Sequence, residues 1–442
     1  MAKKKMTLEE KLEEAIVKDV PYEVPENWGW IKFGTVCKLS NGYAFKSTKY
    51  RENGVPILRI SNIQEFGINF DEKTVYSDYD ETLNRYYVDK GDLLIAMSGA
   101  TTGKTGVYNE DKKAYLNQRV GNIKIEQPEL ITEKFRNYII SYKEKEILDL
   151  AYGGAQPNIS TSMIEGLSIP LPPLKEQQRI VDKIESLFEK LDKAKELIEE
   201  ARNDFENRKS AILEKAFRGE LTKAWRSNNL VDYNSTWTKH VFSNIAKVKS
   251  NLVQPQDFLK YPHIAPDNIE KKTGKLLAYR TIEEDNVKSA KHRFYPGQII
   301  YSKIRPYLSK VVIVDFEGLC SADMYPIETD LDTKYLYYYM LSDTFIDFAS
   351  NSGSRSVLPK INQKELGKIN VPVCSINEQK EIVRILDKLL EEEAKIDELT
   401  ELEEQIELIK KSILAKAFRG QLGTNSEDDE SAIELLKEIL NK

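Results

Sequence analysis

The sequence has few of the residues that build metal sites or disulfide frameworks. Its 442 residues include only three cysteines and three histidines, which are scattered along the chain. Cys37, Cys320 and Cys374 form no Cys-x-x-Cys pair, so neither a disulfide framework nor a zinc ribbon is predicted. The same scarcity leaves no residues for a metal-ligand cluster, a Ser-His-Asp set or a Cys-His pair.

Long hydrophobic runs are also missing. No apolar run approaches the roughly 20 residues that a membrane span requires. The chain starts MAKKKMTLEEKLEEA, which turns acidic where a signal peptide would turn hydrophobic. We therefore expect a cytoplasmic protein with no membrane partner.

The motifs of enzymes that act on DNA are absent as well. An adenine methyltransferase needs a glycine-rich cofactor turn and an [DN]PP[YF] tetrapeptide, but the sequence has no GxGxxG and its only Pro-Pro is LPPL at 171–174. A nuclease of the PD…ExK type needs acidic groups on separate strands, and the segment PDNIEKK at 266–272 is too compact for that. We therefore predict no catalytic residue, metal site or bound cofactor in this chain.

The segment SGATTGKTG at 98–106 is the nearest approach to a phosphate-binding loop. Such a loop needs a glycine, four intervening residues and then Gly-Lys-Ser/Thr, whereas Gly99 stands one residue too close to Gly103. A helix should follow, but VYNEDKKAYLNQRV alternates and breaks like strand and turn. ATP binding is not predicted, and Lys104 in this loop needs another explanation.

Length and charge indicate two domains with an unequal charge distribution. A chain of 442 residues is longer than a single hydrophobic core usually supports, so two domains are expected. The formal net charge is −6, yet residues 27–173 carry 18 basic and 18 acidic side chains, and residues 237–375 carry 19 and 15. The acidic excess lies in the segments 376–422 and 423–442. Two near-neutral or basic bodies remain compatible with a locally bound polyanion.

The second half of the chain repeats the first. KAFRGEL at 215–221 returns as KAFRGQL at 416–422, and IPLPPLKEQQRIVDKI at 169–184 returns as VPVCSINEQKEIVRIL at 371–386. Upstream segments match at a shift of 206 residues. Shifts that drift this slowly indicate a duplicated unit, and two copies favour a pseudo-symmetric pair of modules over a solenoid.

Each copy consists of a β-rich part followed by a long helix. The first parts mix short apolar runs such as PILRI and DLLIAM with turn residues and helical stretches. The predicted fold class is therefore α+β, with two pseudo-symmetric mixed α/β modules separated by two long helices that form an antiparallel coiled coil. The predicted order is an N-terminal amphipathic helix and lead-in at 1–26, module 1 at 27–173, long helix 1 at 174–221, a linker at 222–236, module 2 at 237–373, long helix 2 at 374–422, and an acidic tail with a short helix at 423–442.

Heptad spacing predicts how the long helices pair. Apolar residues recur at alternating steps of four and three in both helices, as in a coiled-coil seam. Capping boxes, Thr7 with Glu10 and Ser431 with Glu434, open short amphipathic helices at both chain ends, which we expect to pack together or against the central pair. The predicted residues of the helix-pair interface are Ile180, Ile184, Leu187, Leu191, Ile198, Phe205, Ile382, Leu386, Leu389, Ile396, Leu402, Ile406, Ile409 and Ile413.

The remaining polar residues of the two modules are candidates for a binding surface. Alignment of the copies pairs Lys104 with Lys310, while the residues around them differ almost completely. It also pairs Asn62 with Asn268, which we expect to form Asx turns. A common scaffold with divergent loop tips is typical of two modules that read different ligands. The candidate DNA-binding residues are Lys46, Arg59, Thr101, Thr102, Lys104, Gln118, Arg119, Gln156 and Asn158 in module 1, and Lys303, Arg305, Tyr307, Lys310, Arg355 and Lys360 in module 2.

These features together resemble a known family. Two dissimilar modules, each followed by a long helix that is introduced by P-L-P-P-L-x-E-Q-x-x-I-V and closed by K-A-F-R-G-E-L, are similar to the specificity subunit of type I restriction-modification systems. The resemblance extends from VPENWGWIKFG through GDLLIAMSGATTGKTGVY and LNQRVGNIKI to the final KAFRGQL. The second helix departs from the pattern at its entry, VPVCSINEQ, but keeps Glu378 and Gln379.

The resemblance implies a DNA-binding subunit without catalysis of its own. Each module would be a target recognition domain that reads one half of a bipartite sequence in double-stranded DNA, with the helices setting the gap between the halves. The helices would also dock two methyltransferase subunits, which use S-adenosylmethionine, and motor-nuclease subunits, which use ATP and Mg, would complete the complex. Those cofactors would belong to the partners.

A duplicated coiled-coil adaptor that binds a non-DNA partner is the alternative. It accounts equally well for the heptads and for the acidic helices, and the charge count does not exclude it.

Overall fold

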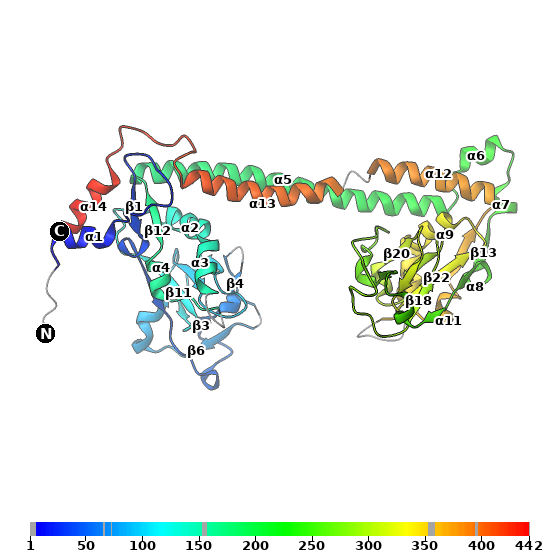
Figure 1. Ribbon diagram of the computed structural model, residues 1–442, viewed down its shortest axis with the longest axis horizontal. Coiled ribbons are helices and arrows are strands. Elements are labelled where there is room, and N and C mark those ends of the chain that lie inside the picture. Colours follow the sequence, from blue (N-terminus) through cyan, green and yellow to red (C-terminus); the bar gives the residue numbers. More distant parts are fainter. Residues whose placement is uncertain are drawn as a thin grey trace. The chain divides into compact units, whose positions relative to one another are not determined.

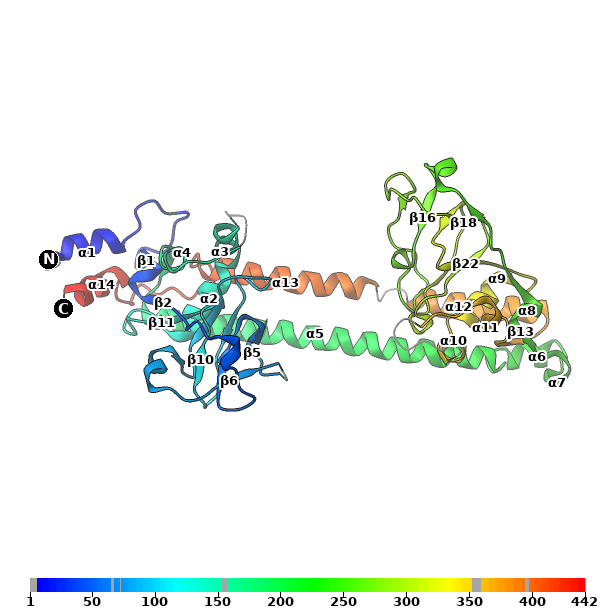
Figure 2. The same cartoon turned by 90° about the horizontal axis from the view of Figure 1, so that it is seen from below.

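The computed structural model describes residues 6–64, 67–71, 73–152, 157–351, 359–393 and 397–441. The chain divides into two compact units, unit 1 comprising Met1–Glu196 and Leu402–Lys442, and unit 2 comprising Leu197–Glu401. Both units contain β-sheets together with helices. Helix α5 (Leu174–Phe217) begins in unit 1 and ends in unit 2. Figures 1 and 2 label the elements of both units.

Unit 1 contains two four-stranded sheets and two strand pairs. One sheet has the order β2-β11-β8-β9, the other β6-β3-β10-β7, and the pairs are β1-β12 and β4-β5. The strands are β1 (Gly29–Lys32), β2 (Cys37–Asn41), β3 (Val55–Leu58), β4 (Ile63–Gln64), β5 (Gly67–Ile68), β6 (Val75–Ser77), β7 (Tyr87–Val88), β8 (Leu93–Ala96), β9 (Thr105–Val107), β10 (Ala114–Leu116), β11 (Val120–Ile125) and β12 (Ser168–Leu171). The helices of this part are α1 (Leu8–Ala15), α2 (Glu133–Tyr142), α3 (Glu144–Ala151) and α4 (Thr161–Glu165).

Unit 2 repeats most of this topology, with β15 as an additional edge strand in its second sheet. Its sheets have the orders β14-β22-β19-β20 and β15-β18-β21-β16-β17, with the strand pair β13-β23. The strands are β13 (Thr238–Val241), β14 (Ala246–Val248), β15 (Leu252–Val253), β16 (Pro262–Ile264), β17 (Arg280–Thr281), β18 (Lys291–Phe294), β19 (Ile299–Ser302), β20 (Val311–Ile313), β21 (Gly318–Cys320), β22 (Met324–Thr329) and β23 (Asn370–Val373). The helices are α6 (Lys223–Asn228), α7 (Tyr233–Thr236), α8 (Phe242–Ile245), α9 (Thr333–Met340), α10 (Asp343–Asn351), α11 (Gln363–Leu366) and α12 (Ile376–Glu393).

The strand registers of the two units agree with the repeat. In β8–β9, Leu93 lies opposite Val107, and in β19–β20, Ile299 lies opposite Ile313, a shift of 206 at both positions. Strand β3 pairs parallel with β10, as β16 does with β21. The duplicated topology confirms the predicted α+β fold class with two pseudo-symmetric mixed modules.

Strand β8 is apolar throughout because both faces of its sheet are buried at this position. In β8, Leu93 and Ile95 face a core that includes α2, α3 and α5, whereas Leu94 and Ala96 face the second sheet. Strand β19 is divided in the same way, with Ile299 and Tyr301 on one side and Ile300 on the other. Successive side chains of a strand point to opposite faces, so the run LLIAM at 93–97 is buried without alternating.

The repeated Glu-Gln at each helix entry ties the helix to its module. Gln177 accepts a hydrogen bond from the Thr132 backbone N–H at 2.9 Å, and Gln379 accepts one from the Asp332 N–H at 2.9 Å. The amide nitrogens donate back to the backbone, from Gln177 to Leu130 and from Gln379 to Cys374. Because both amides are buried, each satisfies backbone groups that would otherwise be left unpaired.

In unit 1, α5 runs antiparallel to α13 (Asp397–Ala417), as Figure 1 shows. Arg179 donates to the Thr424 carbonyl just beyond α13, Lys410 lies 2.6 Å from Asp192, and Lys195 lies 4.0 Å from Glu407. Later residues of α5 thus contact earlier residues of α13. In unit 2, α12 lies beside the last part of α5 and shares its core (Figure 1).

The predicted interface residues differ in burial. Buried are Ile180, Ile184, Ile198, Ile382, Leu386 and Ile406, and partly buried are Leu187, Leu191, Phe205, Leu389 and Ile413. Ile396 lies outside the described residues.

Two predicted interface residues are exposed. Ile409 is 45% exposed because the seam of α13 passes through the next position, where Lys410 pairs with Asp192 and lies over the ring of Phe188. Leu402 is 41% exposed and lies at the limit of unit 1, four residues before the buried Ile406. The heptad pattern counts only apolar residues, so it predicted Ile409 and passed over Lys410, whose long side chain occupies the seam instead.

The two chain ends pack together in unit 1. Helix α1 contacts α14 (Ala432–Asn441), and Lys11 donates to the Leu440 carbonyl at 2.7 Å (Figures 1 and 2). The predicted capping box of Thr7 and Glu10 is formed. The tail also reaches the first module, because Asn425 donates to the buried carboxylate of Glu176 at 3.0 Å.

The segment 222–236, which we expected to be a linker, contains α6 and α7. It is anchored by Arg226, which pairs with the fully buried carboxylate of Glu378. Thr222 donates to the same carboxylate at 2.7 Å. The segment therefore packs on the start of α12 in unit 2, as the tail packs on the start of α5 in unit 1.

Candidate nucleic-acid interface

Three loops of unit 1 converge at the end of the β8–β9 hairpin where the connecting loop lies. The Met97 N–H donates to the Arg119 carbonyl at 2.9 Å, and the Ile159 N–H donates to the Met97 carbonyl at 2.8 Å. Ser98 forms a β-bridge with Asn158. The candidates Thr101, Lys104, Gln118, Arg119 and Asn158 therefore lie on loops that are joined by backbone hydrogen bonds. We call these loops, 97–104, 117–119 and 157–160, the loop cluster of unit 1.

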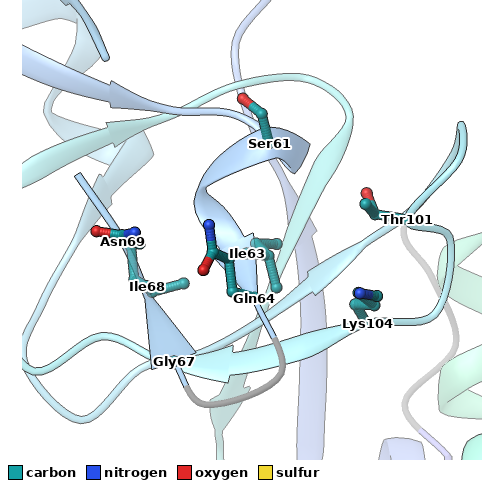
Figure 3. A pocket seen from close by; sticks show the side chains of 8 residues that line it. All are labelled: Ser61, Ile63, Gln64, Gly67, Ile68, Asn69, Thr101 and Lys104. Carbon is teal, nitrogen blue, oxygen red and sulfur yellow. The ribbon is translucent and has the colours of Figure 1, made fainter. Parts of the chain in front are cut away.

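A groove of about 640 Å³ lies beside the loop cluster (Figure 3). Thr101 and Lys104 line one side of it, and the helical turn 60–62 with the β4–β5 hairpin lines the other. Thr101 donates its hydroxyl to the Ile60 carbonyl at 3.3 Å, which connects the two sides. The lining residues are Ser61, Ile63, Gln64, Gly67, Ile68, Asn69, Thr101 and Lys104.

Sequence reasoning missed three polar residues of this groove. Ser61, Gln64 and Asn69 are exposed, and among the described residues their side chains make no intramolecular hydrogen bond. Their only sequence signal was the repeated Asn62, which lies between them. Asn62 forms the expected turn, accepting from the Arg59 N–H at 3.0 Å and donating to the Asn69 carbonyl at 2.9 Å.

Not every candidate of module 1 is available for a ligand. Arg59 is half-buried and donates to the Lys73 carbonyl at 2.6 Å, and Thr102 is buried and donates to the Gly99 carbonyl at 2.7 Å. Both therefore support their own loops. Lys46 is exposed on a separate loop before the 3-10 turn 47–49. Gln156 lies outside the described residues.

Unit 2 contains the same loop cluster. The Lys303 N–H donates to the Asp323 carbonyl at 2.9 Å, and the Ile361 N–H donates to the Lys303 carbonyl at 2.9 Å. Ile304 forms a β-bridge with Lys360, as Ser98 does with Asn158 in unit 1. The cluster of unit 2 thus consists of the segments 303–310, 321–323 and 359–361. It brings together the candidates Lys303, Arg305, Tyr307, Lys310 and Lys360, whereas Arg355 lies outside the described residues.

The three lysines of the loop cluster of unit 2 contact carboxylate and carbonyl groups. Asp323 lies 3.1 Å from Lys360 and 3.6 Å from Lys303. Lys310 donates to the Pro266 carbonyl at 2.7 Å and lies 3.8 Å from Asp267. These contacts fix the lysine side chains and lower the local positive charge.

The tip of the cluster in unit 2 is exposed. Arg305 and Tyr307 are exposed residues of the loop between β19 and β20, and Arg305 has a left-handed backbone with φ 48°. A non-glycine residue in this region must be held by its surroundings. Here the Arg305 N–H donates to the Pro359 carbonyl at 2.8 Å.

Lys104 and Lys310 occupy equivalent positions, as the alignment predicts. Each immediately precedes a strand, and their carbonyls accept from the Ala96 and Ser302 N–H groups, both at 2.9 Å. Their side chains differ, because Lys104 is exposed whereas only 16% of the Lys310 side chain is exposed. One backbone scaffold therefore presents two different polar surfaces.

The described residues offer little for covalent or metal chemistry. They contain no group of three or more His, Cys, Asp or Glu side chains that could hold a metal ion. Burial raises the pKa of the Cys37 and Cys374 thiols to about 12, so neither is a thiolate at neutral pH. Within the described part of the chain, no helix is long and apolar enough to span a membrane.

Comparison with known proteins gives a consistent set of relatives. A family model described as type I restriction modification DNA specificity domain matches residues 25–203 and again 235–407. The EcoDI type I restriction enzyme specificity subunit of Escherichia coli is 34% identical over 423 residues, covering 90% of each chain. The EcoBI specificity subunit of the same organism is 25% identical over 433 residues, covering 90% of this chain and 87% of the relative.

Solved structures share the fold. A chain from a study of complex assembly and conformational transition of the type I R-M system matches with a TM-score of 0.66 at 19% identity, covering 91% of this chain and 100% of that chain. The HsdS subunit from Thermoanaerobacter tengcongensis matches with a TM-score of 0.50 at 18% identity, covering 92% and 100%.

Proposed function

Because the chain belongs to the type I restriction-modification DNA specificity family, we propose that its two units each read one half of a bipartite target in double-stranded DNA. The observation that carries the proposal is the repeated loop cluster, in which equivalent backbones present different side chains. Two recognition surfaces with the same backbone but different polar side chains would suit a target whose two halves differ in sequence.

We assign the contacts of unit 1 to the loop cluster and its groove. Lys104 and Arg119 are exposed cations that suit phosphates or guanine edges. Gln64, Asn69 and Gln118 are exposed amides, which can form paired hydrogen bonds with adenine. Since the side chains of Ser61, Gln64 and Asn69 make no hydrogen bond among the described residues, DNA would satisfy them without breaking an internal bond.

We assign a more selective role to the lysines of unit 2. Asp323 already pairs with Lys303 and Lys360, so a phosphate would have to compete with a carboxylate. An aspartate near a base edge can also accept a hydrogen bond from the cytosine amino group. Arg305 and Tyr307, at the exposed tip, are the residues of this unit most accessible to DNA.

We further propose that α5, α12 and α13 set the unread gap between the half-sites and dock two methyltransferase subunits. The chain would supply no catalysis itself, in keeping with relatives that are named specificity subunits. S-adenosylmethionine would be bound by the methyltransferase subunits, and ATP and Mg by motor-nuclease subunits. The complex would act in the cytoplasm as a defence against foreign DNA.

Mapping of methylated adenines tests this function. The chain would be produced with its methyltransferase partner in a host that lacks other adenine methylation, and the genome would be sequenced for modified bases. We expect one bipartite motif with a fixed gap and one methylated adenine in each half. Absence of any sequence-specific modification by an assembled complex would overturn the proposal and favour the adaptor alternative.

A further inference from the structure

Helix α5 carries one buried lysine that contacts the recognition part of unit 2. Lys209 is 7% exposed, and its ammonium donates to the Lys272 carbonyl at 2.8 Å. Lys272 lies in the turn between Ile269 and Leu276, which form a β-bridge, and has a left-handed backbone with φ 63°. The helix therefore holds this turn by a charge-assisted hydrogen bond.

The same turn continues the connection to the loop cluster. The Lys272 N–H donates to the Leu308 carbonyl at 3.0 Å. Leu308 ends the 3-10 turn Pro306–Leu308, which lies between Arg305 and Ser309, and both flanking residues have positive φ. Two consecutive polar contacts thus join α5 to the loop that presents Arg305 and Tyr307.

The burial of the Lys209 ammonium and the left-handed residues of the loop both require such a connection. Burial lowers the pKa of Lys209, against the raising effect of the carboxylates of Glu206 and Glu270. A buried ammonium is costly unless a fixed acceptor compensates it, and a carbonyl in a turn is such an acceptor. Left-handed residues in the loop also need external support, because their backbone conformation is intrinsically unfavourable.

We propose that Lys209 is a positioning residue, which fixes the loop 305–310 of unit 2 relative to α5. It thereby contributes to discrimination between correct and mismatched bases in the half-site that unit 2 reads, which we call the second half-site. This inference rests on the proposed function. Lys209 itself contacts neither the loop tip nor a DNA-facing surface, since it acts through the main chain of Lys272.

The repeat supplies a matched control. Lys410 occupies the position in the second long helix that Lys209 occupies in the first, at the shift of 201 residues defined by the KAFRG motif. Lys410 contacts Asp192 and lies over the ring of Phe188, both on α5 rather than on a recognition loop. The loop connection is therefore found at Lys209 and not at its counterpart.

The experiment compares Lys209→Met, Lys209→Arg and Lys410→Met in the complete complex with the methyltransferase partner. For each, methylation of the intact target is compared with methylation of targets that carry one mismatch in either half-site. We expect Lys209→Met to reduce the preference over second half-site mismatches about tenfold, the order expected for losing a hydrogen bond to a charged group. Lys209→Arg, which can donate to the same carbonyl, should restore most of that preference. Lys410→Met should leave both preferences unchanged.

Hydrogen exchange gives a second measurement that does not depend on methylation. In Lys209→Met the Lys272 amide and the segment 305–310 should exchange faster, while β16 and β21 remain as protected as in the unchanged chain. If Lys209→Met does not assemble, Lys209→Gln replaces it in both measurements.

The outcomes separate the two proposals. Unchanged discrimination at the second half-site, or equal losses at both half-sites, would overturn the positioning role. If the unchanged complex itself methylated no bipartite target, the proposed function would fail, whereas faster exchange of Lys272 and 305–310 would still support the structural connection.

Discussion

Single residues determine how each unit presents its polar surface. Lys104 and Lys310 have the same backbone environment, yet one ammonium is exposed and the other is held by the Pro266 carbonyl. The difference arises from neighbours outside the aligned strands. Under the proposed function, specificity would therefore depend on pairwise contacts at loop tips rather than on the strands that carry them.

Replacement of Lys104 with Ala should weaken DNA binding through unit 1. If Lys104 contacts a phosphate, its loss also lowers the slope of log affinity against log salt by about one. Titration of the assembled complex against its target at several salt concentrations measures both quantities. Lys112→Ala is the control, since Lys112 is exposed in the loop at the other end of β9. Equal affinity and slope for Lys104→Ala and the unchanged chain would remove Lys104 from the interface.

His292 should make the stability of unit 2 sensitive to pH. It is 5% exposed, and within the described part of the chain its Nδ1 has no hydrogen-bond partner. Burial together with nearby Lys303 holds its pKa below the usual 6.5. The unfolded chain therefore takes up a proton near pH 6.5 while the folded chain does not. The stabilising effect is complete above pH 6.5 and declines as the pH falls toward the folded-state pKa, by at most about 1.4 kcal/mol per pH unit.

Thermal unfolding at pH 7.5 and pH 5.5 tests this expectation. His292→Gln, which cannot take up the proton, should lose less stability over that interval than the unchanged chain. His240→Gln is the control because His240 is exposed. The same pH dependence in His292→Gln and the unchanged chain would show that His292 does not contribute.

At the scale of secondary-structure elements, the sequence predicted strands and helices better than contacts. The 206-residue shift predicted the equivalence of β8–β9 and β19–β20, because identical strand spacing is preserved without gaps. It could not predict the groove of unit 1, because Gln64 and Asn69 approach Lys104 only through the folding of the β4–β5 hairpin. Thr102 was predicted to contact DNA, but it is buried. Its burial depends on the conformation of the loop, which the sequence pattern does not indicate.

Helix α13 offers a direct test of where the helix seam lies. Ile406 is 5% exposed and Ile409 is 45% exposed. Ile406→Ala should lower the free energy of unfolding of unit 1 by about 2–4 kcal/mol, because it leaves a cavity in the seam. Ile409→Ala should change it by less than about 0.5 kcal/mol. Hydrogen exchange of the β8 amides reports on unit 1 alone. Similar losses for both variants would place the seam on the heptad positions that include Ile409.

For the whole molecule, duplication explains how one chain can carry two different readers. The tail binds Glu176 at the start of α5, and the segment 222–236 binds Glu378 at the start of α12. Each module is thus completed by the segment that follows a KAFRG motif. The loop clusters differ while these anchoring contacts have kept a common location, so under the proposed function recognition could change without altering the helices.

The proposed spacer role predicts the effect of lengthening the helices. Adding one heptad to α5 after Glu196 and a second after Glu401 adds about 10 Å to each helix at ~1.5 Å per residue. At about 3.4 Å per base pair this corresponds to a gap longer by about three base pairs. Methylation mapping should therefore return both original half-sites with a wider gap, since neither loop cluster is changed. A heptad added to α5 alone is the control and should impair assembly, because the paired helices would then differ in length. If the doubly extended chain methylated altered half-sites at the original gap, the helices would not set the spacing.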